Sequence, residues 1–136
     1  MIETVRDKLA QIGKKYNNAV FLHGREAFCC EDLCKFFNDR TFGFALGEGN
    51  LFLSSVGFIV RGKMPILVVS VQCAVASLNI LRESVCVPNL NVKIVAFGGE
   101  DLYDVEMMKL LPNMQVYVND FADAMDQYGP AYLRVL

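Results

Sequence analysis

The chain has 136 residues, of which 54% are hydrophobic and 21% charged, and it carries a formal net charge of −2. A chain of this length can bury a sizeable core in one domain, and its composition excludes an intrinsically disordered tail. The small acidic excess offers no basic face for phosphate backbones, so we expect no nucleic-acid partner.

Helix and strand patterns alternate along the chain. Apolar Val5, Leu9 and Ile12 recur at helical spacing, and later apolar runs between turn-forming residues predict buried strands. In chain order we expect a helix ending near Gly13, a strand over 19–22, a helix over 31–38, a strand over 42–46, a helix over 50–60, a strand over 66–71, a helix over 73–85, a strand over 92–97, a helix over 104–111, a strand over 114–118, a helix over 121–127 and a strand over 131–135.

The predicted strands over 66–71 and 92–97 are apolar on both faces, which is typical of a parallel sheet covered by helices on both sides. The sequence therefore predicts an α/β fold, a single three-layer, doubly wound domain with a mainly parallel sheet of about six strands. Because no linker, repeat or low-complexity tract interrupts the pattern, we expect residues 1–136 to form one domain.

The cysteines and the N-terminus indicate a reducing compartment. Five cysteines, an odd number, occur as Cys29, Cys30, Cys34, Cys73 and Cys86. The first ten residues lack the pattern of a signal peptide, and Arg61 and Lys63 interrupt the longest apolar run before it reaches the ~20 residues that a membrane span needs. We expect a soluble, cytoplasmic protein with reduced thiols and no membrane contact.

One carboxylate stands out as a candidate for chemistry. The stretch FGFALGEGNLF, residues 42–52, places Glu48 between Gly47 and Gly49, where a predicted strand leads into a helix. Ligands of open parallel sheets bind at the carboxyl ends of the strands, and the glycines leave room for one. The alternative is that Glu48 only stabilises the helix start, by about 0.3–1 kcal/mol through free amides and the helix dipole.

Other groups of residues give weaker evidence for a functional site. Cys29, Cys30 and Cys34 are not followed by a Cys or His pair at zinc spacing, and His23 stands alone, so we expect no metal site in this chain. The absence of Gly-x-Ser-x-Gly, Walker and Gly-x-Gly-x-x-Gly motifs argues against common hydrolases and nucleotide-binding domains. An α/β domain that binds anions at helix N-termini is a further alternative.

Three stretches, by their order and spacing, carry a family resemblance. Residues 42–52 look like a family "GIAE" strand and helix, a turn follows at 62–65, and Arg82 fits the family's helix arginine. LPNMQV at 111–116 and, after Asp120, GPAYLR at 129–134 look like its closing motifs. From about Ala19 onward the chain thus resembles the pyrimidine-binding domain of the transketolase-like thiamine diphosphate enzymes, which include transketolase, deoxyxylulose phosphate synthase and the pyruvate dehydrogenase β subunit.

The resemblance implies a role for Glu48 and a cofactor. Glu48 matches the glutamate that hydrogen-bonds the aminopyrimidine ring of thiamine diphosphate. Ser70, Cys73 and Ala76 match the positions that line the ring, where the family has aromatic residues. The magnesium and diphosphate are held in these enzymes by another domain with a Gly-Asp-Gly signature, which this sequence lacks.

The resemblance therefore implies at most half of a site, and it comes with departures. The loop at Gly98–Asp101 is shorter than the family's and carries no substrate histidine, and Arg25 stands where the family tends to have an aspartate. Loss of stacking at the ring, worth about 1–3 kcal/mol, would weaken binding of the cofactor.

Two functions follow from this pattern. The first is a stand-alone pyrimidine-binding subunit that contributes Glu48 to a thiamine diphosphate site completed by a separate diphosphate-binding chain, for a transferase or decarboxylase acting on carbon–carbon bonds, inactive alone. The second is a non-catalytic relative that has lost cofactor binding and acts as a dimeric binding or assembly module. Both imply a homodimer or a hetero-oligomer.

Overall fold

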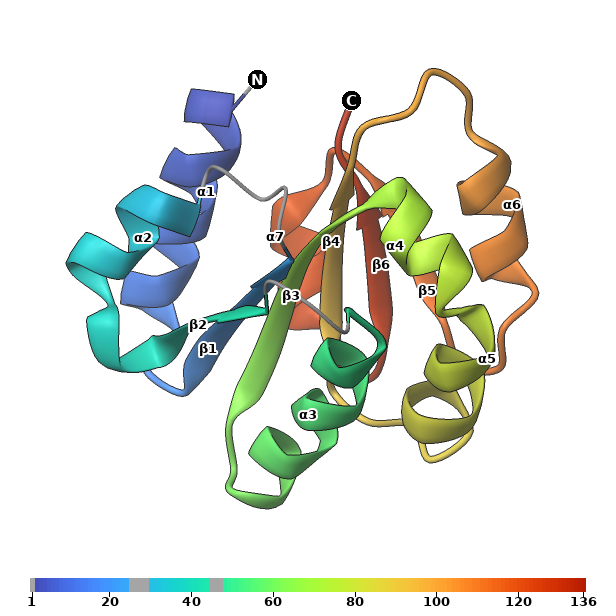
Figure 1. Cartoon of the computed structure of the whole chain (residues 1–136), viewed down its shortest axis with the longest axis horizontal. Coiled ribbons are helices and arrows are strands. Elements are labelled where there is room, and N and C mark those ends of the chain that lie inside the picture. Colours follow the sequence, from blue (N-terminus) through green and yellow to red (C-terminus); the bar gives the residue numbers. More distant parts are fainter. Residues whose placement is uncertain (1, 25–29, 45–47) are drawn as a thin grey trace.

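A six-stranded sheet organises the protein. The computed structural model describes residues 2–24, 30–44 and 48–136 (Figure 1). The strands are β1 (Ala19–Gly24), β2 (Thr41–Phe44), β3 (Met64–Ser70), β4 (Lys93–Phe97), β5 (Gln115–Val118) and β6 (Ala131–Arg134). They lie in the order β2-β1-β3-β4-β6-β5, and every neighbouring pair is parallel.

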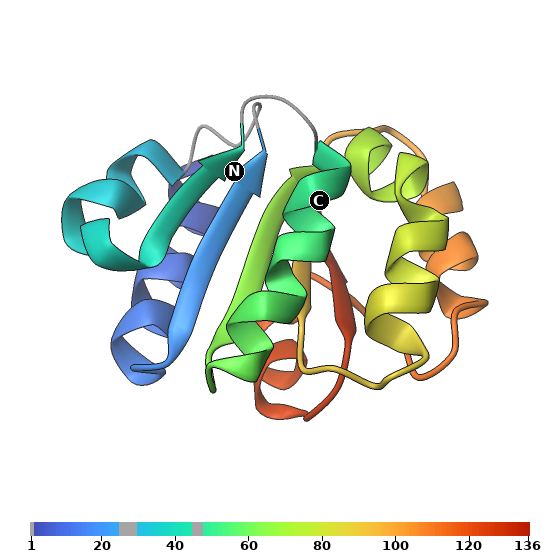
Figure 2. The same ribbon diagram turned by 60° about the horizontal axis from the view of Figure 1, so that its bottom comes forward.

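Helices cover both faces of this sheet. They are α1 (Ile2–Lys15), α2 (Cys30–Phe36), α3 (Glu48–Val60), α4 (Val71–Ala76), α5 (Leu78–Leu81), α6 (Tyr103–Lys109) and α7 (Phe121–Asp126), with a π-helical turn over Arg82–Cys86 and a 3₁₀ turn over Asn38–Arg40. α1, α2 and α7 pack on one face, and α3 to α6 pack on the other (Figures 1 and 2). The predicted three-layer α/β fold is confirmed. None of the described helices is long and apolar enough to cross a membrane.

The two-sided apolar strands explain the layers. Ile66 and Val68 of β3 belong to the core shared with α1, α2 and α7, whereas Leu67 and Val69 belong to the core shared with α3 to α6. All four side chains are fully buried. A strand whose side chains alternate between two apolar cores must lie inside the sheet, which is where β3 lies, between β1 and β4.

The predicted helix over 73–85 is the main departure from expectation. It begins two residues earlier, because the Ser70 side chain caps α4 by accepting a hydrogen bond from the backbone N–H of Cys73 at 3.2 Å. It is then divided at Ser77, whose φ of −102° and ψ of 18° end α4 before α5 starts. The predicted strand over 42–46 is present as β2, and residues 45 and 46 lie outside the described residues.

A buried lysine holds the amino-terminal edge of the sheet. Lys93 opens β4 and is fully buried. Its ammonium donates to the backbone carbonyl of Gln127 and, at 2.9 Å, to that of Gly129. This side chain therefore ties the segment between α7 and β6 to the centre of the sheet.

Candidate ligand site

The topology selects one place at the sheet edge. β1 lies between β2 and β3, so the chain leaves β1 toward β2 and later continues on the other side, at β3. In parallel sheets the crevice beside such a reversal, at the carboxyl ends of the strands, is where ligands bind. His23 near the end of β1, the start of α3, and Ser70 at the end of β3 all belong to this edge.

Glu48 stands at this edge as the first residue of α3. The position agrees with the expectation that it follows a strand and opens a helix. Its side chain lies outside the part of the chain that the structure describes, as does Gly47, so the predicted role of the carboxylate stays a prediction. Close packing favours glycine at position 49, because a Cβ there would lie 3.2 Å from Cδ1 of Ile80 in α5.

The three positions expected to line a ring lie in different surroundings. Ser70 is half-buried at the carboxyl end of β3 and caps α4. Cys73 is buried in the apolar core under α3 to α6. Ala76 is exposed at the end of α4. Ser70 lines a pocket at the carboxyl edge, and neither Cys73 nor Ala76 is among the lining residues of that pocket.

That pocket lies between the ends of β3 and β4 and has a volume of about 320 Å³. It is lined by Ser70, Val71, Gln72, Phe97, Gly98, Gly99, Glu100, Asp101 and Tyr103. Phe97 is the register partner of Ser70 across the sheet, and Tyr103 opens α6. Two aromatic side chains and two carboxylates therefore stand beside Ser70, although none of them occupies an expected ring-lining position.

A buried polar network lies next to this pocket and bonds to two of its lining residues. Arg134, the last residue of β6, forms an ion pair with Asp104 of α6, and both side chains have no exposed surface. The Tyr132 hydroxyl donates to Asp104 at 2.5 Å. Burial first, and then the hydrogen bond to Asp104, raise the pKa of Tyr132 well above its usual value, so this hydroxyl stays protonated.

Arg134 also fixes the loop that closes the pocket. Its second guanidinium nitrogen donates to the carbonyls of Gly99 at 2.9 Å and Asp101 at 3.1 Å. Gly98 and Gly99 adopt φ of +83° and +94°, and a Cβ at Gly99 would lie 3.2 Å from Arg134. Arg134 thus holds this loop by two of its backbone carbonyls, and glycine at position 99 suits both the positive φ and the close approach of the guanidinium.

Sequence reasoning missed this network. Arg134 entered only as part of the closing GPAYLR motif, and Asp104 only as the start of a helix. A signal was available, since an arginine within an otherwise apolar C-terminal strand must find a buried acceptor. The partner could not be read from the sequence, because Asp104 and Arg134 are thirty positions apart.

The remaining expected residues contribute less to a site. The imidazole Nδ1 of His23 lies 3.2 Å from the carbonyl of Gly24, and its ring leaves no room for a Cβ at Gly43. Arg25 and Cys29 lie outside the described residues. Arg82 opens the π-helical turn and pairs with Glu83 at 2.5 Å, about half exposed. Within the described ranges, no group of three or more His, Cys, Asp or Glu side chains could hold a metal ion.

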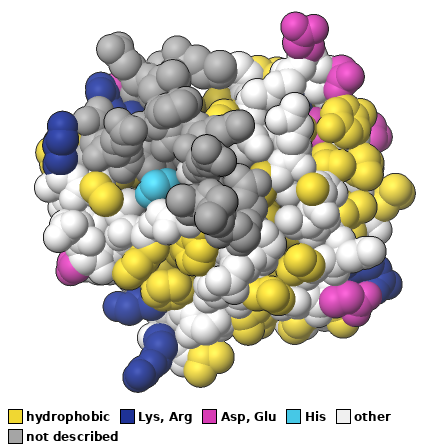
Figure 3. Space-filling view, in the orientation of Figure 1, with side chains coloured by type: hydrophobic (Ala, Val, Ile, Leu, Met, Phe, Trp, Pro, Cys, Tyr) yellow, Lys and Arg dark blue, Asp and Glu magenta, His cyan; other side chains and the backbone are white. Residues whose placement is uncertain are grey.

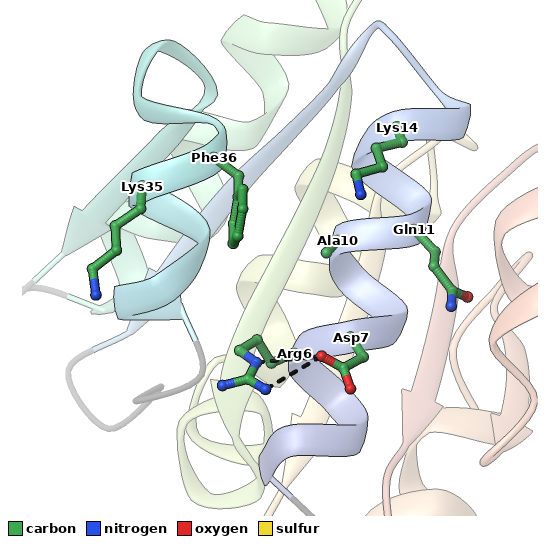
Figure 4. A pocket seen from close by; sticks show the side chains of 7 residues that line it. All are labelled: Arg6, Asp7, Ala10, Gln11, Lys14, Lys35 and Phe36. Atoms are coloured by element: carbon green, nitrogen blue, oxygen red, sulfur yellow. Dashed lines mark hydrogen bonds and ion pairs between the residues drawn. The ribbon is translucent and has the colours of Figure 1, made fainter.

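A larger hollow of about 590 Å³ lies elsewhere, between α1 and α2 (Figure 4). It is lined by Arg6, Asp7, Ala10, Gln11, Lys14, Lys35 and Phe36. It contains none of the expected site residues, and Arg6 is paired with Asp7 within it. Size alone therefore does not identify the chemical site, and we place the candidate at the carboxyl edge beside Ser70.

The fold and the sequence can be compared with known proteins. No protein-family model matches the chain. It is 28% identical over 151 aligned positions, covering 95% of the chain, to a protein of Methanocaldococcus jannaschii described as a putative transketolase C-terminal section. It superposes with a TM-score of 0.83 and 30% identity, over 97% of its length, on a structure described as a split-gene transketolase, inactive β4 tetramer. The predicted resemblance is confirmed.

The chain spans about half the length of both proteins, 48% of the M. jannaschii protein and 50% of the solved chain.

Proposed function

We propose that this transketolase-like chain is a pyrimidine-binding subunit that contributes Glu48 to a thiamine diphosphate site. The observation that carries the proposal is the position of Glu48 as the first residue of α3, beside the reversal of strand order in the sheet. Similarity in sequence and fold to two transketolase sections or subunits supports it.

The residues at the carboxyl edge suit one half of such a cofactor. Phe97 and Tyr103 line the same pocket as Ser70, so aromatic side chains from β4 and α6 offer a surface for a planar ring where Cys73 and Ala76 offer none. Gln72, in the first turn of α4, brings an amide to this pocket. We therefore assign the ring to this pocket, with Ser70 at its edge.

In this proposal the carboxylate of Glu48 accepts a hydrogen bond from a nitrogen of the ring and so controls where the ring holds its proton. When bound, thiamine diphosphate supplies the chemistry that makes and breaks carbon–carbon bonds. Glu48 is suited to its part because a carboxylate that shares a proton with a ring nitrogen can relay proton transfer at neutral pH. Tyr132 and Arg134 act at a distance, by keeping the loop at Gly99 in place.

The proposal requires a second chain. The sequence has no Gly-Asp-Gly signature for magnesium and diphosphate, so these residues do not supply that half of the site. We propose a cytoplasmic hetero-oligomer in which a separate diphosphate-binding chain completes the site, with this chain inactive alone. The reaction would be of the transferase or decarboxylase type.

A second candidate function rests on the same pocket. Glu100 and Asp101 place two carboxylates beside the aromatic residues, and Cys73 and Ala76 provide no stacking surface. These features favour a non-catalytic relative that binds no cofactor and serves as a dimeric assembly module.

Calorimetric titration with thiamine diphosphate and magnesium separates the two candidates. The chain is titrated alone and after mixing with the chain of the same genome that carries Gly-Asp-Gly followed by asparagine. The catalytic proposal expects weak or no binding alone and saturable binding by the mixture, with both chains present in one complex. A stable complex of the two chains that binds no cofactor would overturn the catalytic proposal and support the assembly module.

A further inference from the structure

A basic groove lies between α1 and α2. It is the hollow of about 590 Å³ lined by the cations Arg6, Lys14 and Lys35 and by one carboxylate, Asp7, and we call it the α1–α2 groove. The chain as a whole carries a formal net charge of −2. In Figure 3 the Lys and Arg side chains of the visible face lie mostly on the left half, where α1 and α2 lie, and the Asp and Glu side chains mostly on the right half, where α6 lies. The groove is therefore positive on a weakly acidic protein.

The groove has a cation at each end and apolar surface between them. Arg6, Ala10 and Lys14 follow one another at intervals of four residues, so they share one side of α1. At 1.5 Å per residue, Arg6 and Lys14 start about 12 Å apart along the helix axis. Phe36 of α2 is 66% exposed, and its ring points toward α1 (Figure 4). Positive charge, apolar surface and positive charge thus follow one another along the groove.

We propose that the α1–α2 groove binds an acidic segment of another protein in an extended conformation. An extended chain advances about 3.3 Å per residue and turns every second side chain to the same side. Two carboxylates four residues apart therefore lie about 13 Å apart on one face, close to the spacing of Arg6 and Lys14. The residue midway between them faces Ala10 and Phe36, so the segment carries an apolar side chain there.

Charge and length select this occupant over others. Positive groups at both ends of the groove attract carboxylates and repel a basic partner. A free phosphate or another small anion reaches the cation at one end only, because about 12 Å separates the two ends. A flat anionic membrane surface does not reach the half-buried Ala10 inside the groove. An extended acidic segment contacts both cations and the apolar surface at once.

The groove can accept such a segment without disturbing the core. Arg6 pairs with Asp7 at 3.4 Å and its side chain is still 34% exposed. An exposed pair of this kind is weak, so the guanidinium can turn to a second carboxylate. Leu9 and Ile12 of α1 are buried and fix the helix on the sheet. The inference goes beyond the proposed function, because none of the residues assigned to the cofactor lines this groove.

A synthetic peptide of the proposed pattern tests the inference. Fluorescently labelled Gly-Glu-Ser-Leu-Ser-Glu-Gly is titrated with the chain and followed by fluorescence anisotropy. The wild type should bind it saturably, and the affinity should fall as salt is raised, because the charges are exposed. Lys14→Glu should weaken binding by about 10-fold or more, since it places like charges together at one end of the groove. Phe36→Ser should weaken it through loss of the apolar contact.

The matched control is Lys63→Glu, the same change of charge at an exposed position outside the groove, which should keep the wild-type affinity. Circular dichroism of the variants should match the wild type, because Lys14, Phe36 and Lys63 are exposed. The proposal would be overturned by the absence of saturable binding with the chain at millimolar concentration. Equal affinities of Lys14→Glu and Lys63→Glu would overturn it as well.

Competing ligands separate this occupant from the alternatives. The same peptide with lysine in place of both glutamates should not bind. Inorganic phosphate that displaces the acidic peptide at equal concentration would overturn the proposal in favour of a small-anion site. Binding to vesicles of phosphatidylserine and phosphatidylcholine without binding to the peptide would overturn it in favour of a membrane surface. These results leave the titration with thiamine diphosphate unaffected, so the two proposals can fail separately.

Discussion

Arg134 and Asp104 form an ion pair in which neither side chain has any exposed surface. The pair joins the end of β6 to the first turn of α6, and Tyr132 completes it. Arg134 also donates hydrogen bonds to the carbonyls of Gly99 and Asp101. The buried pair therefore holds the loop at the candidate ligand site in a fixed position against the core.

Breaking this pair on one side should destabilise the fold strongly. Asp104→Asn leaves the buried guanidinium without a counter-charge, which costs about 3–5 kcal/mol in comparable sites. Urea denaturation should show this fall in the free energy of unfolding. The matched control is Lys109→Met, which removes the exposed pair with Glu106 and should cost no more than about 1 kcal/mol. Equal effects of the two variants would contradict this account of the core.

Lys93 should make stability depend on alkaline pH. Burial lowers its pKa from 10.5 to about 8, and unfolding restores the higher value. Between these pH values the unfolded chain binds more protons, so the contribution of Lys93 to the free energy of unfolding rises with pH, by about 1–3 kcal/mol.

The measurement is the difference between the wild type and Lys93→Met. Burial also raises the pKa of Cys86 from 9.0 to about 11, which lowers stability as pH rises through that range, and this contribution cancels in the difference. In urea titrations from pH 7 to 11, the free energy of unfolding of the wild type should rise relative to that of the variant. A difference independent of pH would show that the Lys93 ammonium is not disfavoured by burial.

Tyr103 should contribute to affinity if the ring binds beside Ser70. It is partly exposed and lines the pocket, so Tyr103→Leu removes an aromatic surface without opening the core. Stacking worth about 1–3 kcal/mol corresponds to a loss of roughly 5- to 150-fold in the affinity of the two-chain complex for thiamine diphosphate. Tyr128→Leu, at an exposed tyrosine outside the pocket, should leave the affinity unchanged. The same affinity in both variants would place the ring elsewhere.

Ser70 should matter first for the helix that it caps. Ser70→Ala removes the acceptor for the Cys73 amide and should cost about 1 kcal/mol of stability. Ser70→Asp, which can cap in the same way, should retain most of it. Thermal denaturation of the three proteins decides this, and a Ser70→Ala variant as stable as the wild type would argue against a structural role for the cap.

The layers of this fold could be predicted because β3 and β4 are apolar on both faces. Strands of this kind are typical of a parallel sheet that is covered by helices on both sides. The position of Glu48 followed from the strand and helix on either side of it. The break at Ser77 was not predictable, because the residues around it are compatible with a continuous helix. The aromatic residues beside Ser70 were missed for a different reason. Phe97 and Tyr103 come from later elements, whereas the resemblance pointed only to positions on β3 and α4.

The most direct test of the central claim is exchange of the C2 proton of the thiazolium ring with deuterium, followed by NMR in the complex of this chain with the diphosphate-binding chain. Glu48→Gln should slow the exchange by about 10²- to 10⁴-fold, the range for loss of one proton-transfer group, while the cofactor still binds. Glu83→Gln, at an exposed carboxylate on the π-helical turn, should exchange at the wild-type rate. An exchange rate in Glu48→Gln equal to that of the wild type, with cofactor bound, would contradict the assignment of Glu48.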